Sequence, residues 1–167
     1  MTQREKRKID TVINDFDTAH RDSINRSIQW ICIPMLTLGL MGLVWSIPFP
    51  HLNFLGNYNG FINWASFLIA LTMYYYYKLS PLLSYGILLV LFAFSALIVS
   101  FEKLHLTNNW PSEGTVCLMI FVAGLILQFI GLKKEKVVVT LARQLTFLLN
   151  GPLWLIFNLF QKVGIKG

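Results

Sequence analysis

Residues 82–101 read LLSYGILLVLFAFSALIVSF, a run of 20 residues without a charged side chain. Three more apolar stretches of similar length occupy residues 28–47, 61–77 and 115–132. The hydrocarbon core of a bilayer is about 30 Å thick, so a helix needs about 20 apolar residues to cross it. A soluble domain of 167 residues has too small an interior to hide four such helices. The sequence therefore predicts an all-α, polytopic membrane bundle with four transmembrane helices.

Composition supports the same class of protein. Hydrophobic residues make up 55% of the chain and charged residues only 13%, whereas about 25% charged residues is usual in a soluble domain. The length predicts one membrane domain over residues 1–167. The formal net charge is +6, but the basic residues flank the apolar stretches. That placement indicates contact with membrane lipid and control of topology, and it does not indicate binding of nucleic acid.

The two cysteines, Cys32 and Cys117, both fall inside predicted spans, near opposite ends of the membrane. Two thiols at that separation are not expected to form a disulfide. A free cysteine inside a protein behaves as a small apolar residue. We therefore expect both side chains to be buried free thiols.

The segment 1–26 is polar and begins with a basic cluster. Within it, Ile9, Val12, Ile13 and Phe16 recur with the spacing of one helix face, which predicts an amphipathic helix. With basic residues before it, this helix is expected to lie in the membrane interface on the cytoplasmic side. The sequence leaves one alternative open, in which the apolar face packs on the bundle formed by residues 27–167.

The distribution of basic residues predicts the orientation in the membrane. If the N-terminus faces the cytoplasm, eleven Lys and Arg residues lie on that side, and Lys103 lies alone on the other. Cytoplasmic loops of membrane proteins carry such an excess. We therefore expect a cytoplasmic N-terminus, in either a bacterial inner membrane or an endoplasmic reticulum. The eleven residues are Arg4, Lys6, Arg7, Lys8, Arg21, Arg26, Lys78, Lys133, Lys134, Lys136 and Arg143.

The last apolar stretch, residues 141–160, is interrupted midway by Asn150-Gly151-Pro152. An interior proline removes a helix hydrogen bond and favours a break. The sequence therefore predicts a broken C-terminal helical hairpin that enters the membrane and returns to the cytoplasmic side. A fifth span is the alternative.

This topology brings two polar segments, residues 19–30 and 128–135, to the same cytoplasmic face. On spacing alone, His20 is interpreted as a surface histidine and Glu135 as a solvated charge among lysines. Together with the rest of the chain, however, these segments resemble the membrane 2-hydroxy fatty-acid dioxygenase-like family, long described only as a domain of unknown function. The resemblance runs from about residue 10 to residue 165. The matching elements are His20 with Asn25, Trp30-Ile31-Cys32-Ile33-Pro34, Leu43-Val44-Trp45-Ser46-Ile47-Pro48, Phe61-Ile62-Asn63-Trp64-Ala65, Tyr75-Tyr76-Tyr77-Lys78-Leu79-Ser80-Pro81, Gln128-Phe129-Ile130-Gly131 and Phe147-Leu148-Leu149-Asn150-Gly151-Pro152-Leu153-Trp154-Leu155.

The resemblance implies a reaction and a site. The family comprises small all-helical membrane proteins that shorten 2-hydroxy fatty acids by one carbon in fatty-acid α-oxidation, using O2 and Fe(II). Histidines at the cytoplasmic helix ends are thought to hold the iron. Carried over by position, the resemblance implies His20 and Glu135 as metal ligands, with Asn25 and Lys133 lining the pocket.

The chain departs from the family pattern at two expected histidines. The second histidine of the first motif is Gln29, and the Gly-His-Lys-x-Glu motif has Leu132 in place of its histidine. An iron site of the facial-triad type needs two histidines and a carboxylate. We therefore expect a degraded site that binds iron weakly or not at all, with Gln29 and Leu132 close to His20 as an emptied pocket. Two functions stay open: an active iron oxygenase, and a non-catalytic lipid-binding or partner-binding protein on the same scaffold.

Overall fold

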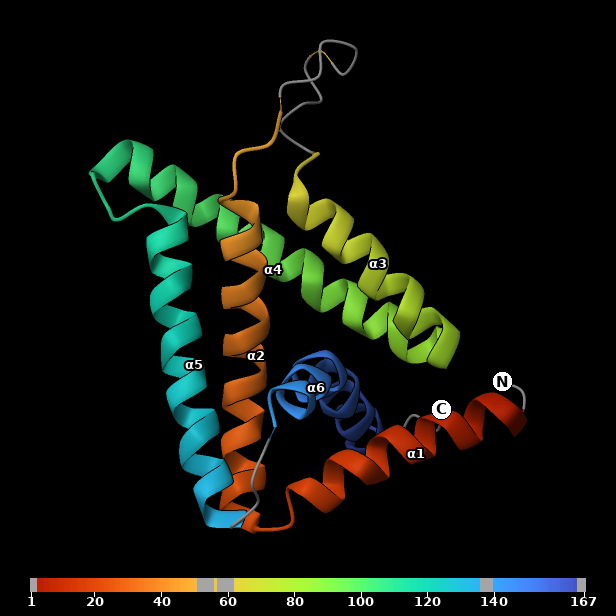
Figure 1. The fold of residues 1–167 in the computed structure, drawn as a ribbon. Coiled ribbons are helices and arrows are strands. Elements are labelled where there is room, and N and C mark those ends of the chain that lie inside the picture. The colour runs from red at the N-terminus through yellow and green to blue at the C-terminus, as the bar shows by residue number, and fades with distance from the viewer. Residues whose placement is uncertain (1–2, 51–55, 57–61, 136–139, 165–167) are drawn as a thin grey trace.

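A computed structural model describes residues 3–50, 56, 62–135 and 140–164, and these form six α-helices. The all-α prediction is confirmed for this part of the chain. Figure 1 shows α2 and α5 side by side, α4 crossing α2 obliquely with α3 alongside it, α6 beside α2, and α1 leading away from the lower end of the pair. The helices are α1 (Gln3–Ala19), α2 (Ser23–Trp45), α3 (Trp64–Leu79), α4 (Pro81–Asn108), α5 (Glu113–Glu135) and α6 (Leu141–Lys162).

Three of these helices are long and apolar enough to cross a membrane. They are α2, α4 and the Glu113–Lys133 part of α5. α3 covers 16 residues, fewer than the ~20 that a perpendicular crossing takes. Its predicted stretch began at residue 61, which lies outside the described residues. The membrane character of the protein therefore rests on three helices.

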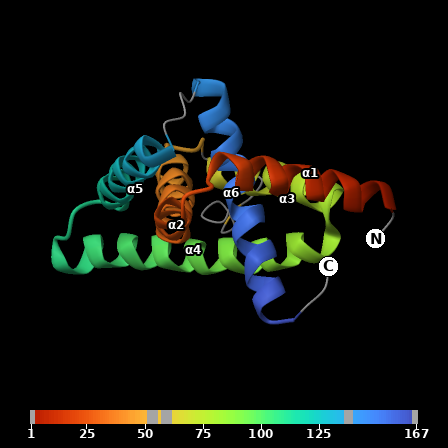
Figure 2. The ribbon, with the colours of Figure 1, turned by 90° about the horizontal axis from the view of Figure 1, so that it is seen from below.

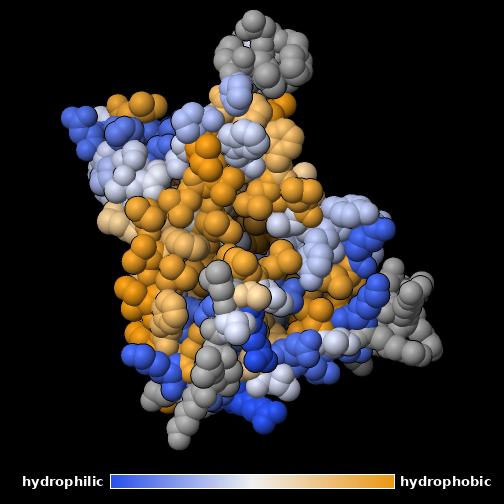
Figure 3. Space-filling model, in the orientation of Figure 1, coloured by the Kyte–Doolittle hydropathy of each residue, from blue (hydrophilic) through white to orange (hydrophobic). Residues whose placement is uncertain are grey.

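The exposed surface of α5 is apolar along one stripe, as expected for a helix that faces lipid. Leu118, Val122, Ile126 and Phe129 follow one another at helical spacing and are each about half exposed. Figure 3 shows apolar side chains over α2 and α5, with hydrophilic residues toward α1 and at the far end of α4. This surface matches a bilayer better than water.

α2 and α5 pack together more extensively than any other helix pair. Small residues allow this approach: a Cβ atom on Gly39 would lie 2.8 Å from the backbone of Phe121, and one on Gly42 would overlap the sulfur of Cys117. Small residues at a helix interface are how membrane helices approach closely. Cys32 and Cys117 are buried and free, as the sequence predicted.

α6 is one continuous helix with Pro152 in its interior, so the predicted break into a hairpin is wrong. Figure 1 shows α6 nearly along its axis, while Figure 2, turned by 90°, shows α6 lengthwise and α2 and α5 end-on. α6 therefore lies across the direction of α2 and α5. It is also not among the three helices with the composition of a span.

Two hydrogen bonds from α3 anchor α6 just before the proline. The hydroxyl of Tyr76 donates a 2.6 Å hydrogen bond to the carbonyl of Leu149, in the turn before Pro152. The hydroxyl of Tyr75 donates to Asn150 Oδ1 at 2.9 Å. The helix carbonyl that loses its N–H donor to Pro152 is that of Leu148, four residues earlier, so these two bonds hold the residues next to it. Asn150-Gly151-Pro152 is thus the point where α6 is held by α3.

The amphipathic helix α1 is present, and its apolar face is buried within the protein. Ile9, Ile13 and Phe16 are at most 5% exposed. Ile13 and Phe16 pack in one cluster with Phe147 and Trp154 of α6. Of the two alternatives for this face, packing on the bundle is what the structure shows, and insertion of the face into lipid is wrong.

Candidate functional site

The polar residues gather where α1 ends and α2 begins. Asp22 is the N-cap of α2, and its Oδ1 accepts hydrogen bonds from the backbone N–H groups of Ile24 and Asn25 at 2.9 and 3.0 Å. An aspartate at this position satisfies amides that have no partner within the helix. The preceding residues 20 and 21 form the short link from α1, so His20 lies at a sharp change of chain direction.

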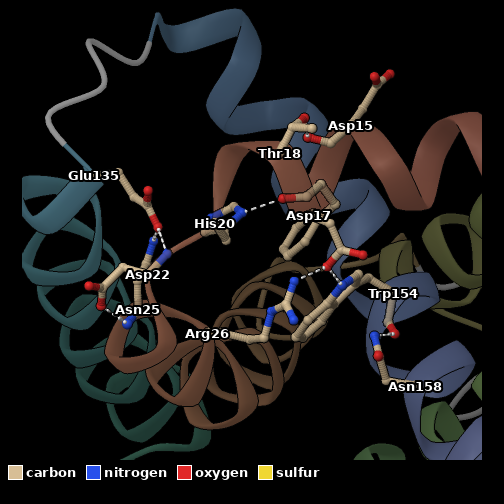
Figure 4. Close-up of polar contacts among 11 residues, drawn as sticks. Asp15, Asp17, Thr18, His20, Asp22, Asn25, Arg26, Glu135, Trp154 and Asn158 are labelled. Atoms are coloured by element: carbon tan, nitrogen blue, oxygen red, sulfur yellow. Dashed lines mark hydrogen bonds and ion pairs between the residues drawn. The ribbon is translucent and has the colours of Figure 1, made fainter.

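His20 is completely buried, so its interpretation as a surface histidine is wrong. Its ring stacks on Phe16, with centroids 4.3 Å apart, and meets the edge of Phe147 at 4.9 Å. Nδ1 lies 2.9 Å from the carbonyl of Phe16, as the dashed line in Figure 4 marks. Because a carbonyl only accepts, Nδ1 carries the proton of this bond. Nε2 is buried without a hydrogen-bond partner among the described residues.

Burial lowers the pKa of His20 below its usual value, because an apolar environment disfavours the imidazolium. The Phe16 carbonyl and the Glu135 carboxylate act in the opposite direction but do not offset the burial. The ring is therefore neutral at pH 7. With Nδ1 protonated, Nε2 presents an unshared electron pair.

Glu135 joins the last turn of α5 to the first turn of α2. Its Oε1 accepts hydrogen bonds from the backbone N–H of Asp22 at 2.7 Å and from the side-chain amide of Asn25 at 3.0 Å. Figure 4 shows the carboxyl group reaching from the end of α5 to these two partners. A carboxylate beside a helix N-terminus is also favoured by the helix dipole. Glu135 is half-buried and has a structural role, so its interpretation as a solvated charge is wrong.

A chain of side-chain amides continues from Glu135 into the protein. Asn25 directs its nitrogen at Glu135 and its oxygen at Gln29, whose Nε2 donates to that oxygen at 3.2 Å. Both amide side chains are completely buried. Gly131 on α5 makes room for them, because a Cβ atom there would overlap Asn25 Oδ1. At the end of this chain, Gln29 Oε1 has no partner among the described residues.

Gln29 lines a pocket of about 200 Å³ between α2, α5 and α6. Its other polar lining residues are Gln128 and Gln144; the remaining walls are apolar. Gln128 Oε1 lies 3.0 Å from the sulfur of Cys32, which can donate to it. The apolar lining residues are Ile33, Leu36, Phe121, Leu125, Leu145, Phe147 and Leu148.

A second pocket of about 140 Å³ lies between α2, α3, α4 and α6. Leu145 and Leu148 of α6 line both pockets. The two pockets therefore adjoin at these two leucines. The first pocket thus has a polar group at Gln29, and the second pocket beside it is mostly apolar.

The structure brings together four of the residues that the sequence singled out. Asn25, Gln29 and Glu135 are joined by hydrogen bonds, and the charge of Glu135 acts on His20. Lys133 is exposed. Leu132 is 6% exposed, and its proximity to His20 stays a prediction.

Sequence reasoning missed Gly131, Gln144, Phe147 and Trp154 as parts of this region. Gly131 and Phe147 stood in the stretches that carried the family resemblance, but nothing local gave them a role. Trp154 donates a 2.9 Å hydrogen bond from Nε1 to Asp17 Oδ1 and stacks on Phe16. Figure 4 shows Asp17 between Trp154 and Arg26, whose guanidinium forms an ion pair with Asp17. These contacts close α6 over the start of α2.

The residues present do not fit an iron site of the facial-triad type. The described residues contain no group of three His, Cys, Asp or Glu side chains that could hold a metal ion. His20 Nε2 has a free electron pair, but Glu135 Oε1 is already bound by two donors. One imidazole and one engaged carboxylate fall short of two histidines and a carboxylate.

Comparison of the chain with protein-family models, with curated proteins and with solved structures finds no match.

Proposed function

We propose that this chain is an integral membrane protein that binds a single-chain lipid, on the scaffold of the 2-hydroxy fatty-acid dioxygenase-like family and without a complete iron site. The observation that carries the proposal is the pocket between α2, α5 and α6. It combines a buried, unpartnered amide oxygen with apolar walls, and it continues toward a second apolar pocket. Sites for small molecules commonly have such a form: mostly apolar, with a few placed polar groups.

In this proposal α2, α3, α4 and α5 all cross the bilayer, with the N-terminus in the cytoplasm. Successive helices of this set run in opposite directions, as Figure 1 allows the reader to follow. α3 exposes Trp64, Phe67, Leu71 and Tyr74 along one face, which suits contact with lipid. Lys78 at its end can extend its ammonium group to the membrane surface. At 1.5 Å per residue, α3 is about 24 Å long, so the bilayer thins slightly beside it.

A second candidate is the activity of the family itself, the Fe(II)-dependent shortening of a 2-hydroxy fatty acid by one carbon. One observation favours it: His20 Nε2 and Gln29 Oε1 are both buried acceptors that have no hydrogen-bond partner within the described residues. Imidazole nitrogen and amide oxygen are both capable of ligating a metal. The incomplete donor set nevertheless places this candidate second.

Iron content separates the two candidates. Protein purified in detergent and loaded with Fe(II) under anaerobic conditions is expected to hold well below one iron per chain. The double change Gln29→His and Leu132→His should raise iron binding sharply if these positions lie beside His20. A matched control is Leu159→His with Gln161→His, which adds two imidazoles at exposed positions of α6. One equivalent of iron on the unmodified protein would reverse the order of the candidates.

Lipid binding is measured with tritiated 1-hexadecanol on the purified protein. The change Leu125→Trp fills the pocket from α5 and is expected to lower the affinity at least tenfold. The change Leu118→Trp, on the exposed side of the same helix, should leave it unaltered. If neither the unmodified protein nor the control variant binds any C16 chain, the proposed function is wrong.

A further inference from the structure

Hydrogen bonding fixes which end of the Gln29 amide is used by Asn25 and which end is left over. Glu135 Oε1 is an acceptor for both of its partners, so Asn25 must turn its NH2 group toward it. Asn25 therefore turns its oxygen toward Gln29, and Gln29 must donate to that oxygen from its own NH2 group. The oxygen of Gln29 is what remains. The carboxyl group at the end of α5 thus sets the polarity of the whole chain of amides.

This polarity leaves a buried acceptor that needs a donor. Gln29 is completely buried, and its Oε1 has no partner in the described part of the chain. A buried polar atom without a hydrogen bond is destabilising, and native proteins rarely leave one unsatisfied. The same residue lines the 200 Å³ pocket. At about 30 Å³ per water-sized group, the pocket has room for at least about six such groups, enough for a headgroup and the first carbons of a chain.

We propose that this pocket selects single-chain lipids with a neutral hydroxyl headgroup, because the hydroxyl donates its proton to Gln29 Oε1. The proposal rests on the proposed lipid-binding function and adds the chemistry of the headgroup. A carboxylate would bring only lone pairs to a lone pair. It would also place an unpaired charge among apolar side chains, where charges are strongly disfavoured. An ester headgroup is neutral, but it also lacks a donor for Gln29.

Four C16 probes test the headgroup on the unmodified protein in detergent at pH 9, where the fatty acid is ionised. They are 1-hexadecanol, methyl hexadecanoate, hexadecanoate and hexadecane. Only the alcohol has a donor. We expect saturable binding of hexadecanol at about one molecule per chain and at least tenfold weaker binding of the other three, since one hydrogen bond to a buried acceptor is worth about a factor of ten.

A variant assigns the preference to Gln29. The change Gln29→Leu should lower the affinity for hexadecanol about tenfold and leave that for methyl hexadecanoate unaltered. Gln161→Leu, at an exposed position of α6, is the control and should change neither. The probe series on the unmodified protein remains decisive even if Gln29→Leu does not fold.

The outcomes separate this inference from the function on which it rests. Equal binding of hexadecanol and methyl hexadecanoate, or tighter binding of hexadecanoate, would overturn the hydroxyl preference while keeping a lipid-binding pocket. Equal binding of hexadecane would mean that the headgroup is not recognised, and it would overturn the preference as well. Failure of every probe to bind would overturn the inference and the proposed function together.

Discussion

The change Gly131→Ala tests how tightly the end of α5 is fitted to the amides of α2. The added methyl group would overlap Asn25 Oδ1 and lie 3.2 Å from Asn25 Cγ. Asn25 cannot turn away without losing its bonds to Gln29 and Glu135, and it is completely buried. Either the two helices separate or the chain of amides breaks. The structure predicts that the protein is destabilised in both cases.

The magnitude follows from three contributions. Forcing an extra methyl group into packed surroundings costs about 1–3 kcal/mol. Leaving a buried amide without its partner costs about 1–3 kcal/mol more. Alanine has a better helix propensity than glycine by about 1 kcal/mol, which acts in the opposite direction. The net loss of unfolding free energy is expected to be about 3 kcal/mol.

Reversible unfolding in mixed detergent micelles measures this loss. Gly86→Ala is the matched control, because a Cβ atom on Gly86 would meet only apolar side-chain atoms, the Cγ2 methyl group of Ile156 and the ring of Phe160, both at 2.9 Å. Its effect should stay within about 1 kcal/mol, since those atoms can move. Adding Asn25→Ala to Gly131→Ala should cost less than the sum of the two single changes. If Gly131→Ala proves as stable as Gly86→Ala, the tight fit described here is refuted.

Three further predictions concern pH, Pro152 and the topology. Since burial lowers the pKa of His20, the unfolded chain binds more protons than the folded chain as the pH falls below about 6.5. The contribution of His20 to the free energy of unfolding is therefore fully present above that pH and is lost beneath it. Unfolding at pH 7.5 and 5.5 checks this, and His20→Asn should flatten the difference. Pro152→Ala should stabilise α6 by about 1–3 kcal/mol, because it restores a helix N–H while the Tyr76 bond stays in place; a destabilised variant would mean that the bundle needs the proline. In intact cells, a cysteine placed at Asn108 should react with an impermeant maleimide, and one at Thr18 only after permeabilisation; the reverse result would invert the topology.

The helices themselves could be predicted from sequence because the apolar stretches are long and nearly free of charge. At the start of α4 the structure follows ordinary capping preferences: Ser80 is the N-cap and Pro81 occupies the first position. Local rules failed at Pro152, where they predict a broken helix. The hydroxyl of Tyr76, which holds the carbonyl of Leu149 near the proline, is 73 residues away in sequence, and no local pattern indicates this contact.

The residues of the candidate site could be predicted from the sequence, but their arrangement in space could not. His20, Asn25, Gln29 and Glu135 were singled out by a resemblance, whereas spacing alone left His20 at the surface. Its burial depends on Phe147, which comes from a helix whose direction the sequence did not reveal. The structural role of Glu135 likewise depends on the N-terminus of α2 lying against the C-terminus of α5.

The pairing of α1 with α6 has a consequence for how the protein is made. α1 leaves the ribosome before α6, yet Phe16 and Asp17 complete their contacts only with Trp154. Until that residue emerges, the nascent chain carries an amphipathic helix with its apolar side uncovered at the membrane surface. A chain terminated before residue 154 would keep that side exposed. The apolar side of α1 is therefore covered only after α6 has been made.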